Sequence, residues 1–356
     1  MSARTHVVVI FGGESAEHDV SCVTAAHVLR ALDPAKYDVT AVGITRQGKW
    51  VIVGDAMAAL AQGPAFLPER LEAAGEPTSI TPLVERARDA DNFVVFPLMH
   101  GPLGEDGTVQ GVFELANVPY VGAGVLGSAV SMDKAVAKQL LAANGIPQPK
   151  YVSLREQHVT RAALQGAVDT LDLPVFVKPA NMGSSVGISK VSSLDELEDA
   201  ARLALTYDEW ILIEEAVTGR EIEVAVLGNE TVRCSVPGEI VPSREFYDYE
   251  DKYVGDGAQL IVPADLDAEE TAAVQQLAEV VFHTLRADGM ARVDFFYEEG
   301  GRGFLCNEIN TIPGFTPISM YPKLWQATGL TYGGLLDELI ALALDRHRRR
   351  RRNTAR

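Results

Sequence analysis

The chain opens with short apolar runs separated by a helical pattern. Residues 6–11 (HVVVIF) form an apolar run that ends at a pair of glycines, and apolar positions then recur at helical spacing through residues 17–32. A second apolar run occupies residues 38–44, and a third, FVVFPLMHG, occupies residues 93–101. We therefore predict a strand at each run and a helix between the first two. This order is typical of an open α/β sheet.

The pattern changes after residue 122. A helix is predicted at residues 131–144, an apolar strand at 174–179 (PVFVKP), a second helix near 193–205 and a second strand at 210–217. A loop rich in glycine and serine joins the first of these strands to the second helix. We predict a separate central domain from this change.

A third region begins at residue 220, where acidic and apolar residues alternate. It contains a polar, aromatic loop at residues 243–259, a long predicted helix at 267–287 and predicted strands at 291–297 and 303–310. Two more helices are expected before the chain becomes rich in arginine. We predict an α/β chain with three domains and a basic end, at residues 1–122, 123–214, 215–345 and 346–356.

The composition fits a protein with more than one domain. The chain has 356 residues, of which 47% are hydrophobic and 22% charged, which is enough to bury a sizeable core. No apolar run approaches the roughly 18 residues of a membrane span, and the N-terminal run is too short for a signal peptide. We therefore expect a cytoplasmic protein without a membrane span. The cysteines, Cys22, Cys234 and Cys306, are scattered, which argues against a disulfide framework or a zinc site.

The net charge is strongly negative, but the C-terminus has the opposite sign. The whole chain carries −18, and residues 346–356 contain seven arginines, so the rest carries −25. A body this acidic is a poor binder of nucleic acid. The arginines could contact RNA or an anionic lipid, so a nucleic-acid or scaffold protein is the alternative class. We expect instead a disordered, solvated tail that takes no part in the chemistry.

Two predicted strands near the C-terminus carry polar side chains on one face. Arg292 and Asp294 lie two apart in ARVDFF, and Glu308 and Asn310 lie two apart in CNEIN, so each pair shares a face of its strand. If the strands form a hairpin, two carboxylates and an amide oxygen converge into a hard-oxygen set that suits Mg²⁺. Arg292 beside them would stabilise a developing oxyanion. A solvated salt bridge between the strands is the alternative.

A glycine- and serine-rich loop follows Lys178. The stretch VKPANMGSSVGIS at residues 177–189 offers small residues whose backbone N–H groups can cradle phosphate oxygens, and Lys178 adds a positive charge. The stretch is not a P-loop, because no Gly-Lys-Ser/Thr opens a helix. We favour a nucleotide-binding flap, and a plain hairpin loop is the alternative.

Three other stretches offer charged or aromatic groups. Glu17 stands at the start of the first helix, where it would either complement the helix dipole or bind a cation such as a substrate ammonium. The glycine pair before this helix does not form the GxGxxG motif, so the binding of NAD is unsupported. Glu214, Glu215 and Glu221 suit the edge of adenine and the ribose hydroxyls, and solvated carboxylates explain the strand-end pair equally well. The loop at 243–259 is either a partner-binding patch or a lid that excludes water. Together these features predict a nucleotide enzyme that transfers a phosphoryl group.

Seven ordered blocks of the sequence resemble the D-alanine–D-alanine ligase family, a member of the ATP-grasp superfamily. The resemblance covers nearly the whole chain except residues 54–90 and the arginine-rich end. One block alone would not be specific, but seven in order are. The blocks are GGESAEHDVS, HGPLGEDGTVQG, SMDKAVAK, VKPANMGSSVGISKV, EFYDYEDKY, ARVDFF and NEINTIPGFTPISMYPKLW.

The resemblance implies an ATP-grasp fold with an N-terminal α/β domain and ATP between the last two domains. It implies that the carboxylate of a first D-alanine attacks the γ-phosphate of ATP. The amine of a second D-alanine then attacks the acylphosphate, and a tetrahedral intermediate loses phosphate. The products are ADP, phosphate and D-alanyl-D-alanine for peptidoglycan. A pair of Mg²⁺ or Mn²⁺ ions and a homodimer are also implied.

The resemblance further implies roles for individual residues. Glu17 would hold the ammonium of the first substrate, and Ser184 and Tyr253 would complete a hydrogen-bonded chain that closes the lid. His100 would lie near the first substrate, and Arg292 would stabilise the acylphosphate and the tetrahedral oxyanion. The ATP contacts would be Lys134, Lys178, Ser184, Glu214, Glu215, Val217, Glu221 and Lys252, the metal ligands Asp294, Glu308 and Asn310, and the second-substrate contacts Ser319 and Met320.

The identity of the second substrate is the main alternative within the family. D-alanine–D-lactate ligases resemble this pattern but replace the tyrosine block, often with a histidine at the position of Tyr253, and D-alanine–D-serine ligases are a further alternative. Here EFYDYEDKY is intact. A cationic lid residue would help to bind anionic lactate, and Tyr253 offers no such charge, so the sequence favours D-alanine.

Overall fold

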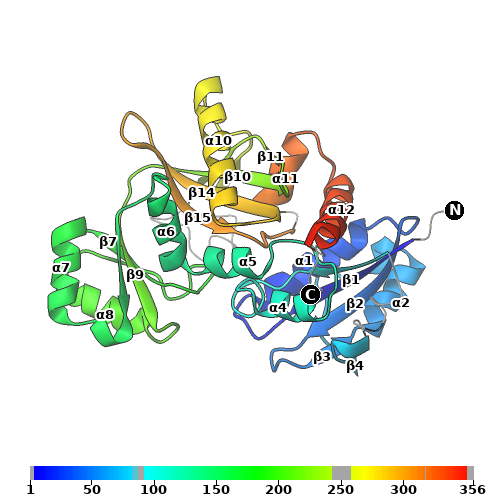
Figure 1. Ribbon diagram of the computed structural model, residues 1–356. Coiled ribbons are helices and arrows are strands. Elements are labelled where there is room, and N and C mark those ends of the chain that lie inside the picture. The colour runs from blue at the N-terminus through cyan, green and yellow to red at the C-terminus, as the bar shows by residue number, and fades with distance from the viewer. Residues whose placement is uncertain (1–3, 83–84, 86–91, 243–257, 317, 351–356) are drawn as a thin grey trace, which may run out of the picture.

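The computed structural model describes residues 4–82, 85, 92–242, 258–316 and 318–350 (Figure 1). Figure 1 shows the N-terminal domain on the right, the central domain on the left and the C-terminal domain above and between them. Most of the predicted lid, including Lys252 and Tyr253, lies outside the described residues, as do residues 351–356 of the basic end.

The N-terminal domain is built on a mixed sheet with the strand order β4-β3-β2-β1-β5. Strands β1, β2 and β5 are parallel, and β3 and β4 are antiparallel to their neighbours. This confirms the predicted open α/β sheet, although β5 ends at Pro97, before His100. The elements are β1 (Thr5–Gly12), α1 (His18–Ala31), β2 (Tyr37–Ile44), β3 (Trp50–Ile52), α2 (Gly54–Gln62), η1 (Pro64–Phe66), β4 (Glu76–Pro77), β5 (Phe93–Pro97) and α4 (Thr108–Leu115).

The central domain has an antiparallel sheet in the order β6-β9-β7-β8. The helix predicted at residues 131–144 is present as α6 (Lys134–Ala143), but it begins three residues later, and the preceding α5 (Val125–Met132), separated from it by Asp133, was not predicted. The backbone of Asp133 is extended, and its side chain caps the second helix by accepting from the Val136 N–H. The elements are α5 (Val125–Met132), α6 (Lys134–Ala143), β6 (Tyr151–Arg155), η2 (Glu156–His158), α7 (Arg161–Leu171), β7 (Val175–Pro179), β8 (Ser189–Val191), α8 (Leu194–Ala204) and β9 (Trp210–Glu215).

The C-terminal domain has a sheet in the order β13-β12-β10-β14-β15, with β11 paired to β10. A capping box between Asp267 and Glu270 fixes the start of its long helix. Strands β14 and β15 form the predicted hairpin, which brings their polar residues together. The elements are β10 (Arg220–Gly228), β11 (Val232–Cys234), β12 (Gly238–Val241), β13 (Gln259–Ile261), α10 (Ala268–Thr284), β14 (Gly289–Glu298), β15 (Gly303–Asn310), α11 (Met320–Ala327) and α12 (Tyr332–Arg350).

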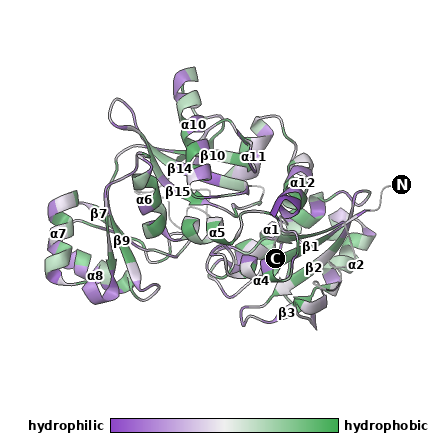
Figure 2. Cartoon of the chain, in the orientation of Figure 1, coloured by the Kyte–Doolittle hydropathy of each residue, from purple (hydrophilic) through white to green (hydrophobic). Residues whose placement is uncertain are grey.

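One hydrophobic core joins the N-terminal and C-terminal domains. It packs Val9 and Leu29 of the first domain with Trp325 of α11 and with Leu336 and Ile340 of α12. None of these side chains is more than 3% exposed. Figure 2 shows the apolar strands of the sheets and the mixed polar and apolar surfaces of the helices around them. Helix α12 therefore belongs to the core of the first domain although it lies at the other end of the chain.

Polar contacts also hold α12 on the N-terminal domain. Asp337 accepts a hydrogen bond from the Tyr37 hydroxyl at 2.6 Å. Arg346 is 3% exposed, lies over the Tyr120 ring at 4.1 Å and donates to the Tyr120 backbone oxygen at 3.2 Å. The expectation of a disordered tail is therefore wrong for residues 346–350, which continue α12 because Arg346 is fixed by buried contacts.

The part of the chain that the structure describes contains no single helix that is long and apolar enough to cross a membrane. One bent pair of helices, α11 with α12, has the length and composition of a membrane span, and only these two properties support a span there. Cys22, Cys234 and Cys306 are free thiols, and burial raises the pKa of each to about 12. None of them is therefore activated as a thiolate nucleophile at neutral pH.

Candidate active site

Two adjoining cavities lie where the three domains meet. The smaller has a volume of about 120 Å³ and the larger of about 490 Å³, and the larger falls within the roughly 300–1,000 Å³ that is usual for ligand pockets. Lys134, Ser184, Glu223, Arg292 and Glu308 border both cavities. A molecule in either cavity would therefore meet the same group of polar and charged side chains.

Glu17 faces this cleft instead of capping its own helix. It precedes α1, and its side chain makes no capping hydrogen bond. Ser184 of the central domain donates its hydroxyl to the Glu17 carboxylate. A Cβ atom at Gly101 or Gly183 would lie 2.7 Å from Glu17 Oε2, so glycine at both positions leaves room for the carboxylate. The helix-dipole interpretation does not account for this orientation, and the role toward an ammonium stays a prediction.

His100 and Glu105 form a buried pair beside the smaller cavity. His100 Nδ1 lies 3.0 Å from the backbone oxygen of Ile312 and 3.3 Å from Glu105 Oε1. Burial alone would lower the pKa of His100, but the hydrogen bond and the negative charge of Glu105 outweigh it, so the pKa is raised. His100 Nε2 makes no hydrogen bond to any described residue. Since His100 borders the cavity, this nitrogen is available to a ligand there.

The hairpin of β14 and β15 brings the predicted polar cluster together. Arg292 pairs in register with Asn310, and Asp294 with Glu308, directly before an irregularity in the ladder. The guanidinium of Arg292 forms two hydrogen bonds of 2.7 Å to the Asp294 carboxylate. Its Nε also lies 3.0 Å from Glu223 Oε2, and the Asn310 amide donates to Asp294 Oδ2 at 3.0 Å. The salt bridge that we considered as the alternative is therefore present, but it is largely buried and borders the cavities.

The environment of Arg292 keeps its guanidinium charged. Burial by itself would lower the pKa of Arg292, but the charges of Asp294 and Glu223 and the hydrogen bonds to Asp294 raise it well above its usual value. The same two carboxylates restrict the orientation of the planar group. The site thus holds a fixed positive charge between its two cavities.

The glycine- and serine-rich loop lies over the cleft. Ser184 and Ser185 have backbone φ angles of 50° and 60°, a left-handed conformation that residues other than glycine rarely adopt. Lys134 Nζ donates to the Met182 backbone oxygen at 2.6 Å and lies 3.7 Å from Glu308 Oε2. The loop is therefore attached to the first domain through Ser184 and to α6 through Lys134.

Glu214 borders the larger cavity, and its carboxylate is bound to two buried lysines. Its carboxylate lies 2.8 Å from Lys138 Nζ and 2.5 Å from Lys178 Nζ, and the residue is 2% exposed. Burial raises the pKa of Glu214, but the two ammonium charges outweigh it and lower the pKa to about 2. Its side chain thus holds Lys178 in place, and its contact with adenine stays a prediction. The carboxylate of Glu215 accepts hydrogen bonds from the Lys150 N–H at 2.7 Å and from Arg302 at 2.5 Å.

The remaining predicted residues lie on the walls of the two cavities. Val217 and Glu221 border the larger one. Ser319 and Met320, at the start of α11, border the smaller one. The Ser319 hydroxyl accepts from the Thr316 N–H at 3.0 Å and lies 2.7 Å from the Thr316 hydroxyl. Lys252 and Tyr253 lie outside the described residues.

Sequence reasoning missed Lys138, Glu105, Thr316 and Glu223. Lys138 follows Lys134 by four positions in SMDKAVAK, a spacing that places both on one face of a helix. Glu223 lies in the alternating strand β10, on the same face as Glu221. Glu105 and Thr316 follow glycine- and proline-rich turns, where no periodic pattern marks which side chains point inward.

The fold and the cleft define a class of protein. Two antiparallel sheets enclose a nucleotide-sized cavity with buried lysines, and a smaller polar cavity adjoins it. This is the arrangement of an ATP-grasp ligase. Within the described residues, no group of three or more His, Cys, Asp and Glu side chains could hold a metal ion.

Comparison with known proteins gives the family. The model of the D-ala D-ala ligase N-terminus matches residues 6–123, and that of the D-ala D-ala ligase C-terminus matches residues 140–341. The D-alanine–D-alanine ligase of Geobacillus thermodenitrificans is 46% identical over 97% of this chain and 96% of its own length, and that of Solibacter usitatus is 48% identical over 98% of both. The chain belongs to the D-alanine–D-alanine ligase family.

Solved structures agree with this assignment. The D-alanine–D-alanine ligase from Coxiella burnetii is 38% identical, with a TM-score of 0.83 over 98% of this chain and 97% of that one. The VanG D-Ala:D-Ser ligase from Enterococcus faecalis is 36% identical, with a TM-score of 0.82 over 96% of this chain and 100% of that one. These similarities support the ATP-grasp fold predicted from the sequence.

Proposed function

We propose that this protein uses ATP to join two D-alanine molecules into D-alanyl-D-alanine for peptidoglycan synthesis, through an acylphosphate intermediate. The observation that carries the proposal is the wall shared by the two cavities, where Lys134, Arg292 and Glu308 border both. Transfer of a phosphoryl group requires the nucleotide and its acceptor to meet across such a wall. Full-length relatives of the same family support this choice of reaction.

ATP would occupy the larger cavity. Lys134 and Lys178 border it and supply positive charge for the phosphates, and Ser184 belongs to the loop whose backbone N–H groups would cradle them. Glu215, Val217 and Glu221 also border this cavity, so we assign the adenine and ribose to the part of the cavity that these residues line. Glu214 would act indirectly, because it holds Lys178. Lys252 would add a further cation from the lid.

The first D-alanine would occupy the smaller cavity. Its ammonium would bind the Glu17 carboxylate, in place of or beside the Ser184 hydroxyl. His100 Nε2 would hydrogen-bond the same molecule. The substrate carboxylate would then face Arg292 and the ATP phosphates, which is the orientation that its phosphorylation requires.

The second D-alanine would bind at the start of α11. Ser319 and the Met320 N–H lie at a helix N-terminus that borders the smaller cavity, and such a terminus favours a carboxylate. Tyr253 would close the site from the lid. D-serine is the alternative second substrate, because a D-Ala:D-Ser ligase has a similar fold, and D-lactate is a further one.

A pair of Mg²⁺ or Mn²⁺ ions would bind at the hairpin, where two carboxylates and one amide, rather than three His, Cys, Asp or Glu side chains, would supply the oxygen ligands. Asp294 already accepts hydrogen bonds from a guanidinium and an amide, so its carboxylate is directed toward positive partners at the cleft. Glu308 lies opposite it in the ladder, and rotation of the Asn310 amide would present oxygen instead of nitrogen. When bound, the ions would neutralise phosphate charge and orient the transferring group.

The side chains of the protein itself would supply positioning and charge stabilisation. Arg292 remains charged and is fixed by Glu223 and Asp294, so it is arranged in advance for the negative charge that develops on the acyl oxygen. The Ser184 loop lies over the cleft and would keep water from the acylphosphate.

The quaternary and domain organisation are proposals that rest on the resemblance to the family. We propose a cytoplasmic homodimer and domains at residues 1–122, 123–214 and 215–345. The described strands of the N-terminal and C-terminal sheets each fall within one of these ranges, and β9 of the central sheet ends at Glu215, one residue past the proposed boundary.

The decisive test is release of phosphate from Mg-ATP that depends on D-alanine. D-alanine, D-serine and D-lactate would compete as second substrates, and mass spectrometry would identify the products. We expect D-alanyl-D-alanine as the main product; absence of D-alanine-dependent phosphate release would refute the proposal. The alternative class predicts salt-sensitive nucleic-acid binding that is lost when residues 346–356 are removed, without any response to D-alanine.

A further inference from the structure

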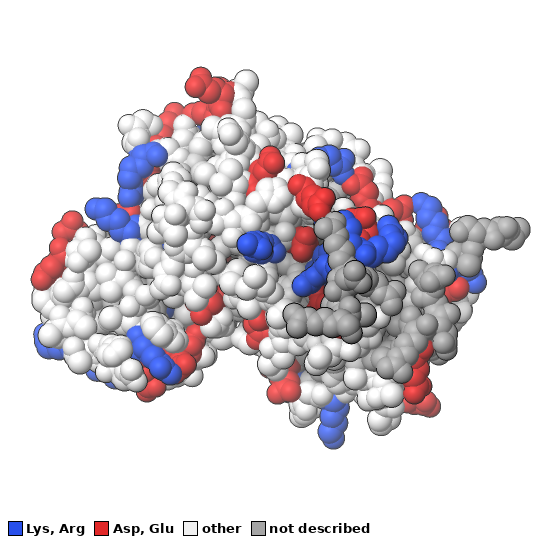
Figure 3. Space-filling model, in the orientation of Figure 1, with Lys and Arg blue, Asp and Glu red and all other residues white. Residues whose placement is uncertain are grey.

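A third cavity, distinct from the active site, is rich in arginine. It has a volume of about 350 Å³ and lies among α5, the loop that follows α10, and the end of α12. Its charged residues are the basic Arg286, Arg346, Arg349 and Arg350 and the acidic Glu230 and Asp288. With His283 neutral, the wall therefore carries a net charge of +2 in a chain whose net charge is −18. Figure 3 shows basic side chains with acidic ones among them near the end of α12.

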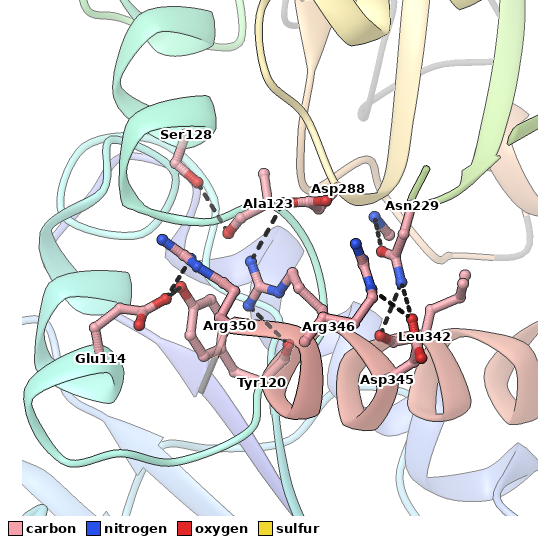
Figure 4. Close-up of polar contacts among 12 residues, drawn as sticks. Glu114, Tyr120, Ala123, Ser128, Asn229, Asp288, Leu342, Asp345, Arg346 and Arg350 are labelled. Carbon is pink, nitrogen blue, oxygen red and sulfur yellow. Dashed lines mark hydrogen bonds and ion pairs between the residues drawn. The ribbon is translucent and has the colours of Figure 1, made fainter. Parts of the chain in front are cut away.

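Arg346 presents a buried donor that lacks a full partner. Its Nη2 donates to the Tyr120 backbone oxygen at 3.2 Å, and the residue is 3% exposed. Its Nη1 makes no hydrogen bond to any described residue, and the ion pair with Asp288 Oδ2 is stretched to 4.0 Å. Figure 4 shows this guanidinium between Tyr120 and Asp288, with a dashed line to each. A buried donor in this state is costly unless a ligand accepts its hydrogen bond.

The start of α5 adds backbone donors to the same cavity. No side chain caps this helix, so its first N–H groups have no partner within it. Gly124, Leu126 and Gly127 border the cavity. A Cβ atom at Gly124 would lie 2.7 Å from Arg350 Nη1 and 3.2 Å from Arg346 Nη1. The glycine therefore leaves a cradle in which two guanidinium groups approach the end of the helix.

Two further arginines can contribute. Arg349 is bonded to Glu230 and Asp345, each at 2.9 Å, yet its Nη2 has no acceptor among the described residues. Arg350 is paired with Glu114 at 2.6 Å. Arg286 is exposed and borders the cavity, and it forms no ion pair with any residue that the structure describes.

We propose that this cavity binds a small phosphate-type oxyanion, at a site separate from the ATP site. Guanidinium groups and the N–H groups at a helix start are the donors that tetrahedral oxyanions prefer. The wall combines α5, the C-terminal sheet domain and α12, so a bound anion connects segments that are far apart in the sequence. Binding therefore stabilises the folded protein through mass action.

The test compares inorganic phosphate binding to the full-length protein and to two variants. Arg286→Gln removes a cation without breaking an ion pair, and Gly124→Ala fills the cradle at a backbone φ of −76° that alanine tolerates. Arg161→Gln, an exposed arginine on α7 in the central domain, is the matched control. All three variants are expected to retain D-alanine-dependent phosphate release, which shows that they fold.

Calorimetry and thermal denaturation would be run with phosphate against chloride at equal ionic strength. We expect phosphate to raise the Tm of the wild type and the control, and its Kd to weaken by about tenfold, or about 1.4 kcal/mol, in Arg286→Gln and Gly124→Ala. Equal affinity in all four proteins, or no phosphate-specific rise in Tm, would overturn the proposal. So would a signal that persists in both variants and disappears in Lys178→Ala, because it would belong to the ATP site.

Discussion

The buried carboxylate of Glu214 should be among the largest single contributors to the stability of the central domain. Replacement by glutamine keeps the shape of the side chain but leaves Lys138 and Lys178 beside it without their common counter-charge. Breaking a buried ion pair by removing one partner typically costs about 3–5 kcal/mol. We therefore expect Glu214→Gln to destabilise the domain strongly at pH 7.

The lowered pKa of Glu214 gives a second value for its contribution to the free energy of unfolding, and it predicts how that contribution depends on pH. Its lowering from 4.5 to about 2 corresponds to roughly 3 kcal/mol of stabilisation of the folded state, at 1.36 kcal/mol for each pH unit. Because the folded-state pKa is lowered, this contribution is complete above about pH 4.5 and is lost as the pH falls toward 2. The difference in stability between wild type and Glu214→Gln should shrink over the same interval.

The measurement is denaturant unfolding followed by the fluorescence of Trp210, which lies on the same strand as Glu214. Glu209→Gln is the control, because Glu209 is 56% exposed and pairs with Arg155 at 2.8 Å, so its loss should cost less than about 1 kcal/mol. A Glu214→Gln protein that is no less stable than the control at pH 7 would refute the reasoning. A difference from wild type that stays constant from pH 5 to about pH 3 would refute the assignment of the pKa.

Three further predictions concern the reaction. Arg292→Ala should lower kcat by about two orders of magnitude or more with little change in the Kd for ATP, and unchanged turnover would exclude its role at the oxyanion. Glu17→Gln should raise the KM for the first D-alanine by about tenfold, the effect of losing one charge-assisted hydrogen bond, whereas the KM for ATP should not change; equal effects on both would point to a general loss of structure. Glu105→Gln should lower the pKa of His100, since the charge of Glu105 raises it, and should move the acidic limb of the kcat/KM profile to lower pH; an unmoved limb would show that His100 does not control it.

The elements with strong periodic patterns could be predicted from the sequence. The runs HVVVIF and FVVFP became buried parallel strands because neither face of such a strand meets solvent. The i, i+2 spacing in ARVDFF and CNEIN placed four polar side chains correctly, because the period of a strand fixes which residues share a face. The boundary between α5 and α6 at Asp133 was not predicted. An aspartate within an apolar pattern caps a helix only if the backbone is extended there, and the sequence pattern does not show the backbone conformation.

Long-range contacts explain the parts that the sequence could not reveal. Glu214 lies near the end of the apolar strand β9, and its lysine partners lie on α6 and β7, so its burial depends on tertiary packing. Arginine repeats near a terminus usually indicate a solvated end, and nothing in the local sequence signals that Tyr120 would bury Arg346. Composition describes the average behaviour of such a segment, whereas here contacts with residues distant in the sequence, Tyr120, Glu114 and Glu230, hold it on the protein.

The position of α12 has a consequence for synthesis of the protein on the ribosome. The first domain lacks part of its hydrophobic interior until Leu336 and Ile340 have been translated. At the usual 5–20 residues per second, the segment from residue 123 to residue 350 takes roughly 10–45 s to emerge, and for that time one side of the first sheet is uncovered. A chaperone would therefore be needed while the N-terminal domain has been made but α12 has not. A C-terminal truncation that removes α12 would leave this side of the first sheet uncovered permanently.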